Sequence, residues 1–304
     1  MSHLEAANLY NAKGLVAVIT GGGSGLGRTM ALTLAINGAS KVFILGRRED
    51  ALRETVSLAP ADKQSAIIPI PADVSSQSSL ESAYNTISAQ TSHVDTLIVN
   101  SGILGPPARI NAKSDGSLPS IDELKEYLWS IPMAEFNKVF EVNTTGAYYT
   151  AIAFLPLLDA ANKRRPAPQK NVLSAPLSQI IIISSIAGFS RRVPFDFAYN
   201  LSKSAVNHLV KVLSTSLTDY QIRVNGIAPG LYHSEMSADE NFEQGDKGVS
   251  DGSFDKGKIP MTRAGGEEDI AGLILWMAGG SGGYLNGNIT VTDGGRLSVL
   301  PTAY

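Results

Sequence analysis

The feature that most restricts the fold is a regular alternation between short β-branched or aliphatic runs and longer amphipathic segments. The short runs are apolar almost throughout, which is typical of strands buried on both faces of a parallel sheet. Repeated strand–helix–strand units of this kind form a doubly wound sheet with helices on both faces. The predicted strands are residues 15–20, 41–45, 66–70, 95–99, 179–184, 222–228 and 288–292.

The segments between these runs carry helical periodicity. Leu26, Met30 and Leu34 form one apolar stripe, because side chains three or four residues apart share a helix face. The chain has no dividing linker rich in Pro, Ser or Gly, so we expect one domain over residues 1–304. Further helices are predicted at 76–90, 133–162, 200–220 and 267–279.

The sequence therefore predicts an α/β protein with a single doubly wound, Rossmann-type domain. Its sheet would have seven strands, mostly parallel, and helices on either side. A cofactor-binding half would span about residues 14–130, and a catalytic and substrate half about residues 131–304.

Three long segments interrupt this pattern, at 103–122, 163–178 and 231–258. Loops of this length are usually functional or disordered. We expect the first and third to form walls or lids of a site. The second is rich in Pro, Lys and Arg, and we expect a solvated surface excursion.

Composition excludes several classes of function. The formal net charge of −3 argues against a polyanion such as nucleic acid as partner. The absence of cysteine excludes disulfides, a thiol nucleophile and thiolate metal sites, and the four histidines are scattered without ligand spacing, so no metal site is expected. No apolar run approaches the roughly 20 residues of a membrane helix, and no signal peptide is apparent. We therefore expect a cytoplasmic protein with no membrane partner.

The stretch "TGGGSGLGRT", residues 20–29, fits two phosphate-binding motifs. Residues 22–29 resemble the P-loop of nucleotide hydrolases, whereas residues 20–27 read T-G-x-x-x-G-x-G, a dinucleotide-type turn. Both place glycines between a strand and a helix, where backbone N–H groups and the helix dipole attract phosphate. Against the P-loop, Arg28 replaces its lysine and does not reach phosphates in the same way. A plain tight turn is the third alternative, and the turn alone does not decide.

Later motifs decide it, because the chain from about residue 14 to 295 resembles the short-chain dehydrogenase/reductase family. The similarity is greatest to fungal members, some of them near bacterial 3-oxoacyl reductases. The glycine turn matches the family pattern through Thr20, Gly21, Gly25 and Gly27. The other matching positions are Asp73 in "ADVS", Asn100 and Gly102 in "VNSG", Asn143 in "EVNTTG", Ser185 in "IISSIAG", Tyr199 and Lys203 in "AYNLSK", "APG" at 228–230 and "DGG" at 293–295.

The resemblance implies catalytic roles for Asn143, Ser185, Tyr199 and Lys203. Tyr199 and Lys203 lie four apart on a predicted helix, so they share one face. A close ammonium lowers the pKa of a tyrosine, which is otherwise near ~10, and lysine has further donors for the cofactor ribose. By resemblance, Ser185 binds the substrate oxygen, with Ser184 as the competing choice, and Asn143 holds a water that passes protons to the lysine.

The resemblance also implies a nicotinamide cofactor. At the end of the second strand stands Gly46, followed by Arg47 and Arg48 rather than an acidic residue. A guanidinium there suits a 2′-phosphate, so we predict NADP(H) with Arg47 as its contact; the alternative is that both arginines only solvate a helix start. The predicted cofactor-binding residues are Gly21, Ser24, Gly25, Leu26, Gly27, Arg47, Asp73, Asn100, Gly102, Tyr199, Lys203, Gly230, Tyr232 and Ser234.

The function expected from the resemblance is an NADPH-dependent carbonyl reductase, or alcohol dehydrogenase in reverse. Its substrate would be a hydrophobic ketone or alcohol, in a cleft bounded by apolar residues such as Leu231, Tyr232 and Met236. Two alternatives stay open: a non-redox step such as cyclisation or dehydration on the same fold, and a non-catalytic NADP(H) sensor. The segments 146–162 and 205–217 are apolar over more than one helical stripe, which predicts a homotetramer or homodimer.

Overall fold

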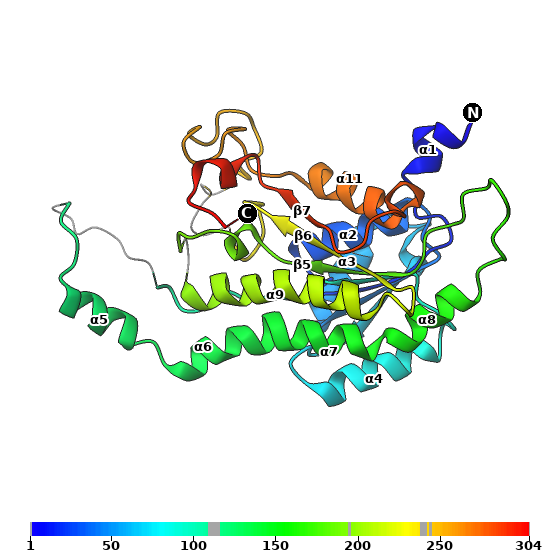
Figure 1. Ribbon diagram of the computed structural model, residues 1–304, viewed down its shortest axis with the longest axis horizontal. Coiled ribbons are helices and arrows are strands. Elements are labelled where there is room, and N and C mark those ends of the chain that lie inside the picture. Colours follow the sequence, from blue (N-terminus) through cyan, green and yellow to red (C-terminus); the bar gives the residue numbers. More distant parts are fainter. Residues whose placement is uncertain (1, 109–115, 194–195, 238–241, 243–244, 304) are drawn as a thin grey trace.

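A seven-stranded sheet forms the centre of the protein in the computed structural model (Figure 1), which describes residues 2–108, 116–193, 196–237, 242 and 245–303. All strand pairs are parallel and the order is β3-β2-β1-β4-β5-β6-β7. This confirms the predicted doubly wound α/β fold, with a sheet that is wholly rather than mostly parallel. The strands are β1 (Val16–Thr20), β2 (Lys41–Gly46), β3 (Ile67–Pro71), β4 (Thr96–Val99), β5 (Gln179–Ile183), β6 (Arg223–Pro229) and β7 (Ile289–Thr292).

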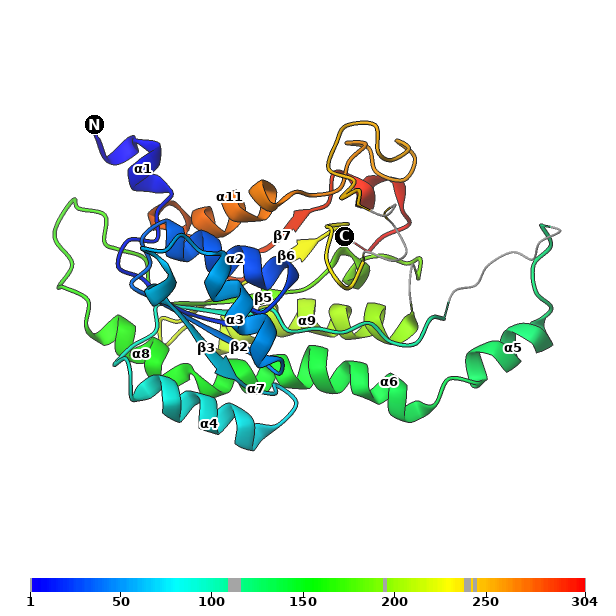
Figure 2. The ribbon, with the colours of Figure 1, turned by 180° about the vertical axis from the view of Figure 1, so that it is seen from behind.

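Helices cover both faces of the sheet. Figures 1 and 2 show α2, α3 and α11 on one face and α4, α7 and α9 on the other. The longer helices are α2 (Gly25–Ile36), α3 (Glu49–Leu58), α4 (Gln77–Ser88), α5 (Ile121–Trp129), α6 (Met133–Phe140), α7 (Gly146–Ala153), α8 (Leu155–Lys163), α9 (Phe197–Ser216) and α11 (Glu267–Ala278). The short helical segments are η1 (Ser2–Leu4), α1 (Ala6–Leu9), η2 (Gln64–Ala66), η3 (Glu141–Thr145), η4 (Ile186–Gly188), η5 (Gly280–Gly282) and η6 (Arg296–Val299).

The strands divide their side chains between two hydrophobic cores. In β1, Val16 and Val18 pack into the core beneath α7 and α9, whereas Ala17 and Ile19 pack into the core beneath α2 and α11. Alternate side chains of a strand point to opposite faces, so a strand covered on both sides must be apolar throughout. This explains the apolar runs of the sequence. Because one sheet takes strands from both halves of the chain, we infer one domain.

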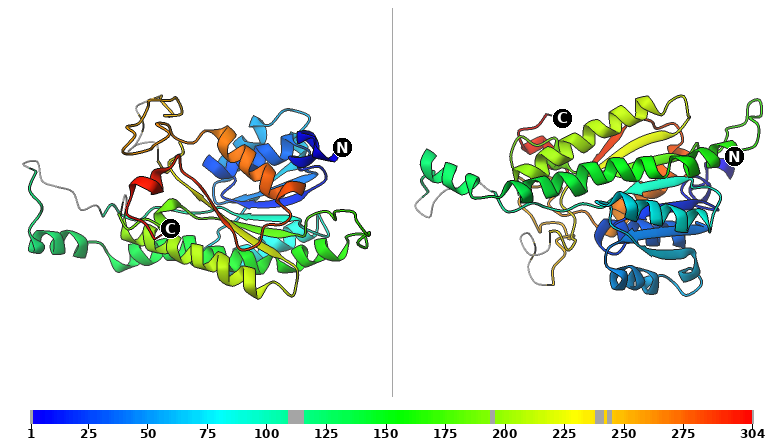
Figure 3. Two further views of the ribbon diagram at one scale, coloured as in Figure 1. Left: turned by 45° about the horizontal axis from the view of Figure 1, so that its top comes forward. Right: turned by 90° about the horizontal axis from the view of Figure 1, so that it is seen from below.

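The helix predictions were less complete. The helix α3 was not predicted, and α5 begins at Ile121, inside the segment expected to be a loop. A capping box of Ser120 and Glu123 starts α5, but the helix has no buried residue, so it lacks the core-facing stripe that predicts a helix. Figure 3 shows α5 extending away from the sheet. The single helix expected at 133–162 is divided into α6, a π-helical turn at η3, α7 and α8.

The long segments behave partly as expected. Residues 166–175 are all exposed, in agreement with a solvated excursion at 163–178. Parts of the other two segments, residues 109–115, 238–241 and 243–244, lie outside the described residues. Within the described ranges, no helix has both the length and the apolar character needed to cross a bilayer.

Because all strands are parallel, their carboxyl ends meet at one edge of the sheet. The chain order reverses between β1 and β4, which lie side by side. Ligands of open α/β sheets bind outside the carboxyl ends of the strands at such a switch point. The glycine turn follows β1 and the "VNSG" element follows β4, so both lie at this position.

Candidate active site

A cavity of about 720 Å³ opens where β1, β4, β5 and β6 end. The residues that follow these strands line it, beginning with Gly21, Asn100, Ser184 and Gly230. The cavity contacts every predicted site residue except Gly27 and Asn143. The structure thus brings together positions that are up to about 200 residues apart in the sequence.

The glycine turn is built for close backbone approach. Gly21 has a positive φ of 68°, a conformation that side chains rarely adopt. A Cβ on Gly27 would overlap the Gly21 carbonyl oxygen and lie 2.5 Å from Asn100 Nδ2. Asn100 Nδ2 donates to the Thr20 carbonyl oxygen at 3.0 Å, which ties the turn to β4. Gly27 therefore sits behind the cavity wall and lets α2 begin directly under the turn.

This arrangement fits a bound phosphate. The amino end of α2 begins at Gly25 and has no acidic residue in its first turn, so backbone N–H groups and the helix dipole are available to an anion. Ser24 and Leu26 line the same wall. Ser234 Cβ lies 3.2 Å from the position of a Cβ on Gly25, so Ser234 is also next to the turn.

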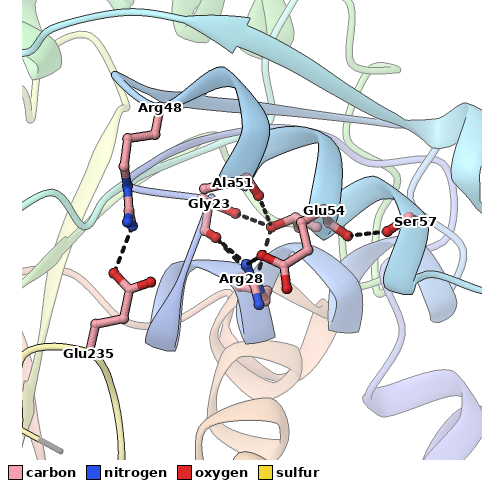
Figure 4. Close-up of polar contacts among 9 residues, drawn as sticks. Gly23, Arg28, Arg48, Ala51, Glu54, Ser57 and Glu235 are labelled. Carbon is pink, nitrogen blue, oxygen red and sulfur yellow. Dashed lines mark hydrogen bonds and ion pairs between the residues drawn. The ribbon is translucent and has the colours of Figure 1, made fainter.

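Arg28 has a structural role. Its guanidinium donates to the Gly23 carbonyl oxygen at 2.6 Å and pairs with Glu54 of α3 at 2.6 Å (Figure 4). It also donates to Thr55 Oγ1 at 3.2 Å. Arg28 braces the glycine turn against α3 and does not line the cavity. The residue in the place of the P-loop lysine thus points away from any phosphate on the turn, which goes against the P-loop interpretation.

The far end of the cavity is polar and charged. Asp73 Oδ1 accepts hydrogen bonds from the Ser75 hydroxyl at 2.7 Å and the Ser75 amide at 2.9 Å. These bonds lower the pKa of Asp73, with a further contribution from the Arg47 guanidinium. Arg47 lines the cavity and has no ion-pair partner among the described residues. Arg47 is therefore available to an anion here.

Arg48 forms an ion pair with another residue of the cavity wall. It pairs with Glu235 at 2.6 Å, and both side chains are more than half exposed (Figure 4). The hydrogen bond and charge of Glu235 raise the pKa of Arg48. The two residues are 187 positions apart in the chain, and no local pattern of the sequence indicates their contact.

Asp196 caps α9, the helix that carries Tyr199 and Lys203, and was not predicted. Asp196 Oδ1 accepts from the Tyr199 amide at 2.6 Å and caps α9. Its Oδ2 accepts from the Gly105 amide at 2.9 Å, so one carboxylate joins α9 to the segment after β4. The helix was predicted at 200–220 and begins at Phe197. An aspartate shortly before a helical pattern is an N-cap signature that could have identified Asp196.

Tyr199, Ser185 and Lys203 meet at the inner wall of the cavity. Contrary to the expectation of a lowered value, the pKa of Tyr199 is raised, chiefly by burial. The hydrogen bond with Ser185 opposes this shift, the charge of Asp196 adds to it, and Lys203 is not among its causes. Lys203 Nζ lies 5.7 Å from the centre of the Tyr199 ring and donates to the Ile183 carbonyl oxygen at 2.9 Å. Burial lowers the pKa of Lys203 to about 8.

Of the two neighbouring serines, the geometry favours Ser185. Ser184 is buried, and its hydroxyl donates to Asn207 Oδ1 at 2.6 Å. Ser185 Oγ accepts from the Ala187 amide at 3.1 Å, which caps η4, and is hydrogen-bonded to Tyr199. Only Ser185 thus joins the tyrosine.

Asn143 stands behind the wall in the π-helical turn η3, a distortion that is frequent at functional sites. Asn143 Oδ1 accepts from the Ile103 amide at 2.8 Å, and its Nδ2 donates to the Ile103 carbonyl at 2.9 Å. A Cβ on Gly102 would lie 3.3 Å from Asn143 Oδ1 and 3.4 Å from Lys203 Nζ. Asn143 and Lys203 thus flank the same glycine.

Two further features extend the predicted site. Tyr232 lines the cavity, but its side chain packs in the core and its hydroxyl lies 2.6 Å from Thr292 Oγ1. Arg296 and Leu300 also line the cavity, although no motif indicates them. They come from the C-terminal segment, which pairs with the chain after η4 through Ser190 and Thr302.

Comparison with known proteins agrees with this geometry. Residues 15–245 match the family described as "short chain dehydrogenase". The chain is 43% identical over 304 residues to the short-chain dehydrogenase/reductase PhomF of the fungus Diaporthe leptostromiformis, covering 99% of this chain and 97% of that protein. It is 31% identical to the rhamnolipids biosynthesis 3-oxoacyl-[acyl-carrier-protein] reductase of Pseudomonas aeruginosa, covering 94% and 97%. The solved complex of Pseudomonas aeruginosa RhlG with NADP has a TM-score of 0.74 and 28% identity, covering 95% and 98%.

Proposed function

The chain belongs to the short-chain dehydrogenase family and is an oxidoreductase with a nicotinamide cofactor and a small-molecule substrate, and on this premise we propose that it is an NADPH-dependent carbonyl reductase. In reverse it would oxidise the corresponding alcohol. One observation carries the proposal: Tyr199, Ser185 and Lys203 line the same cavity as the glycine turn. The substrate would be a hydrophobic ketone.

The chain's own residues divide the work. When bound, the nicotinamide supplies a hydride in reduction and accepts one in oxidation. Tyr199 donates the proton that the substrate oxygen needs, and the Ser185 hydroxyl holds that oxygen by a hydrogen bond. Both hydroxyls act on one oxygen, which agrees with the hydrogen bond between them.

Lys203 and Asn143 complete the proposed tetrad. The ammonium of Lys203 favours the tyrosinate left after proton transfer and offers donors to the cofactor ribose. Asn143 fixes the backbone at Ile103, and with Lys203 it flanks Gly102. We propose that a proton relay runs along this side of the cavity toward Lys203.

NADPH is the proposed cofactor because of the residues at the end of β2. Gly46 provides no carboxylate for a ribose hydroxyl pair, and Arg47 lines the cavity beside Asp73. A guanidinium binds phosphate through charge-assisted hydrogen bonds. The similarity to a structure solved with NADP points the same way.

Replacing Arg47 with alanine should weaken NADPH binding by roughly 10- to 100-fold and leave NADH binding nearly unchanged. A hydrogen bond to a charged group contributes roughly 1.5–3 kcal/mol, and 1.4 kcal/mol is about tenfold in affinity. Fluorescence titration of both cofactors measures this. Arg53→Ala is the charge-matched control, because Arg53 pairs with Glu49 on α3 and does not line the cavity. Equal losses of affinity for NADPH and NADH would contradict the assignment of Arg47 to the 2′-phosphate.

We further propose that the protein is a homodimer or homotetramer assembled through α7 and α9. These helices lie side by side on one face (Figure 3), and α7 exposes Tyr148 and Tyr149 by 42% and 41%. Light scattering should show a dimer or tetramer, and the double variant Tyr148→Glu/Tyr149→Glu a monomer. Tyr284→Glu, at a fully exposed tyrosine elsewhere, should change nothing. A wild-type monomer at micromolar concentration contradicts this proposal. A cytoplasmic location stays a prediction, and the resemblance to fungal members adds the proposal of a role in fungal secondary or lipid metabolism.

A further inference from the structure

One charged side chain of the cavity belongs neither to the cofactor end, nor to the tetrad, nor to an ion pair. Arg47, Arg48 and Asp73 lie at the ends of β2 and β3, where the cofactor phosphate is proposed to bind. Glu235 is paired with Arg48, and Lys203 belongs to the tetrad. Arg296 is the remaining charged residue of the described cavity wall.

Among the described residues, Arg296 forms no ion pair or side-chain hydrogen bond, and only the charge of Asp293 acts on it. The nearest acid along the chain is Asp293, and its carboxylate is committed to backbone amides. Its Oδ1 accepts from Gly295 at 2.9 Å and its Oδ2 from Leu297 at 2.7 Å. Burial lowers the pKa of Arg296, and Asp293 opposes this effect only through its charge. A partly buried guanidinium without a hydrogen-bonded partner is costly, so an anion arriving in the cavity would be stabilised.

The segment that carries Arg296 is fixed on the substrate side. Before it, the Gly294 carbonyl oxygen accepts from the Met261 amide at 3.0 Å. After it, the Arg191 amide donates to the Pro301 carbonyl oxygen at 2.8 Å and the Ala303 amide donates to Phe189 at 2.8 Å. Figure 1 shows this red segment between the loop before α11 and the turn after β5. The turn after β5 begins at Ser185, so the segment with η6 lies against the part of the chain that follows Ser185.

Apart from Ser190, the side chains beside Arg296 in this part of the wall are mostly apolar. Leu300 follows η6, Ile186 follows Ser185, and Met236 belongs to the loop after β6. An apolar lining with a single cationic group suits a ligand with a hydrophobic body and one anionic end. The planar fork of arginine matches a carboxylate in a bidentate manner.

We propose that Arg296 binds a carboxylate of the substrate, so that the preferred substrate is a hydrophobic keto acid. This inference rests on the proposed reductase function, because it assumes that the ketone occupies the cavity beside Tyr199. The product would be the corresponding hydroxy acid. The carboxylate fixes the orientation of the substrate and takes no part in the hydride or proton transfer.

The test uses the NADPH-saturated protein and two probes of one skeleton, 2-naphthoate and 2-naphthamide, which differ in charge. Their binding is followed by calorimetry. The wild type should bind the carboxylate at least about 10-fold more tightly than the amide, as a charge-assisted hydrogen bond implies. Arg296→Gln should abolish this preference, and Arg296→Lys should retain part of it. Arg191→Gln, at an exposed arginine near the same segment but outside the cavity wall, should behave as wild type.

Equal binding of the two probes, binding of neither probe, or a preference that survives in Arg296→Gln would overturn the inference. The NADPH affinity of each variant is measured first and should be unchanged. A wild type that does not bind NADPH would instead contradict the proposed reductase, and the inference with it. The two failures are thus distinguishable.

Discussion

Replacing Tyr199 with phenylalanine should lower carbonyl reduction by about 10²–10⁴-fold, the range expected for loss of a general acid, while NADPH affinity stays nearly constant. The variant deletes one hydroxyl and keeps the ring, which is buried at 8% exposure. The cofactor contacts proposed for Lys203, Asn100 and the glycine turn remain. Turnover of NADPH with a ketone and fluorescence titration of NADPH measure the two quantities separately.

Serine variants provide the control for this prediction. Ser185→Ala should cause a comparable fall, and the double variant with Tyr199→Phe little more, because the two hydroxyls act as a unit. Ser184→Ala removes a hydroxyl that bonds to Asn207, so it should alter stability and spare the chemistry. Near-full turnover by Tyr199→Phe would show that the tetrad interpretation is wrong.

Replacing Gly27 with alanine should destabilise the protein by ~1–3 kcal/mol, as overpacking typically does, and weaken NADPH binding by roughly 10- to 100-fold. The new Cβ would overlap the Gly21 carbonyl oxygen and approach Asn100 Nδ2 to 2.5 Å. Alanine gains about 1 kcal/mol in helix propensity, and the overlap with backbone outweighs this gain. Relief of this overlap would move the glycine turn, and with it the backbone amides that are proposed to face the cofactor phosphate. Urea unfolding and NADPH titration measure the two losses.

Gly272→Ala is the matched control, because Gly272 lies in α11 and a Cβ there meets nothing within 4 Å. That substitution should stabilise the protein by about 0.5–1 kcal/mol and leave NADPH binding unchanged. If Gly27→Ala also gains stability and keeps NADPH affinity, the glycine turn is not the tight cofactor cradle described above.

The sequence predicted the sheet well because burial on both faces leaves a clear pattern. In β5 all five residues from Gln179 to Ile183 are buried, and four of them are isoleucine. The glycine turn and Ser185 follow the ends of β1 and β5, whereas Tyr199 and Lys203 lie on α9 and Asn143 in η3. Each of these positions lies in a short sequence motif, which is why the sequence could suggest them as site residues. The topology of the sheet then brings these ends to one cavity, so motifs far apart in the chain become neighbours.

The rest depends on contacts that leave no local pattern. Arg48 meets Glu235 only because the loop after β6 passes the end of β2. Arg296 enters the cavity because the C-terminal segment pairs with residues 189–191, which periodicity does not reveal. The helix α5 has no buried side chain, so its residues do not repeat the stripe of a core helix. Such positions follow from tertiary structure rather than from the sequence near them.

The most direct measurement of the central claim is isotope transfer. The protein is incubated with a ketone substrate and NADPH deuterated at nicotinamide C4, with the pro-R and pro-S forms in separate reactions. The proposed reductase predicts one deuterium on the new carbinol carbon from one of the two forms, and one product per NADPH consumed. A product that forms without NADPH, or without deuterium from either form, would contradict the account. The fold would then serve a non-redox step such as cyclisation or dehydration, and binding of NADPH with no product at all would indicate a sensor.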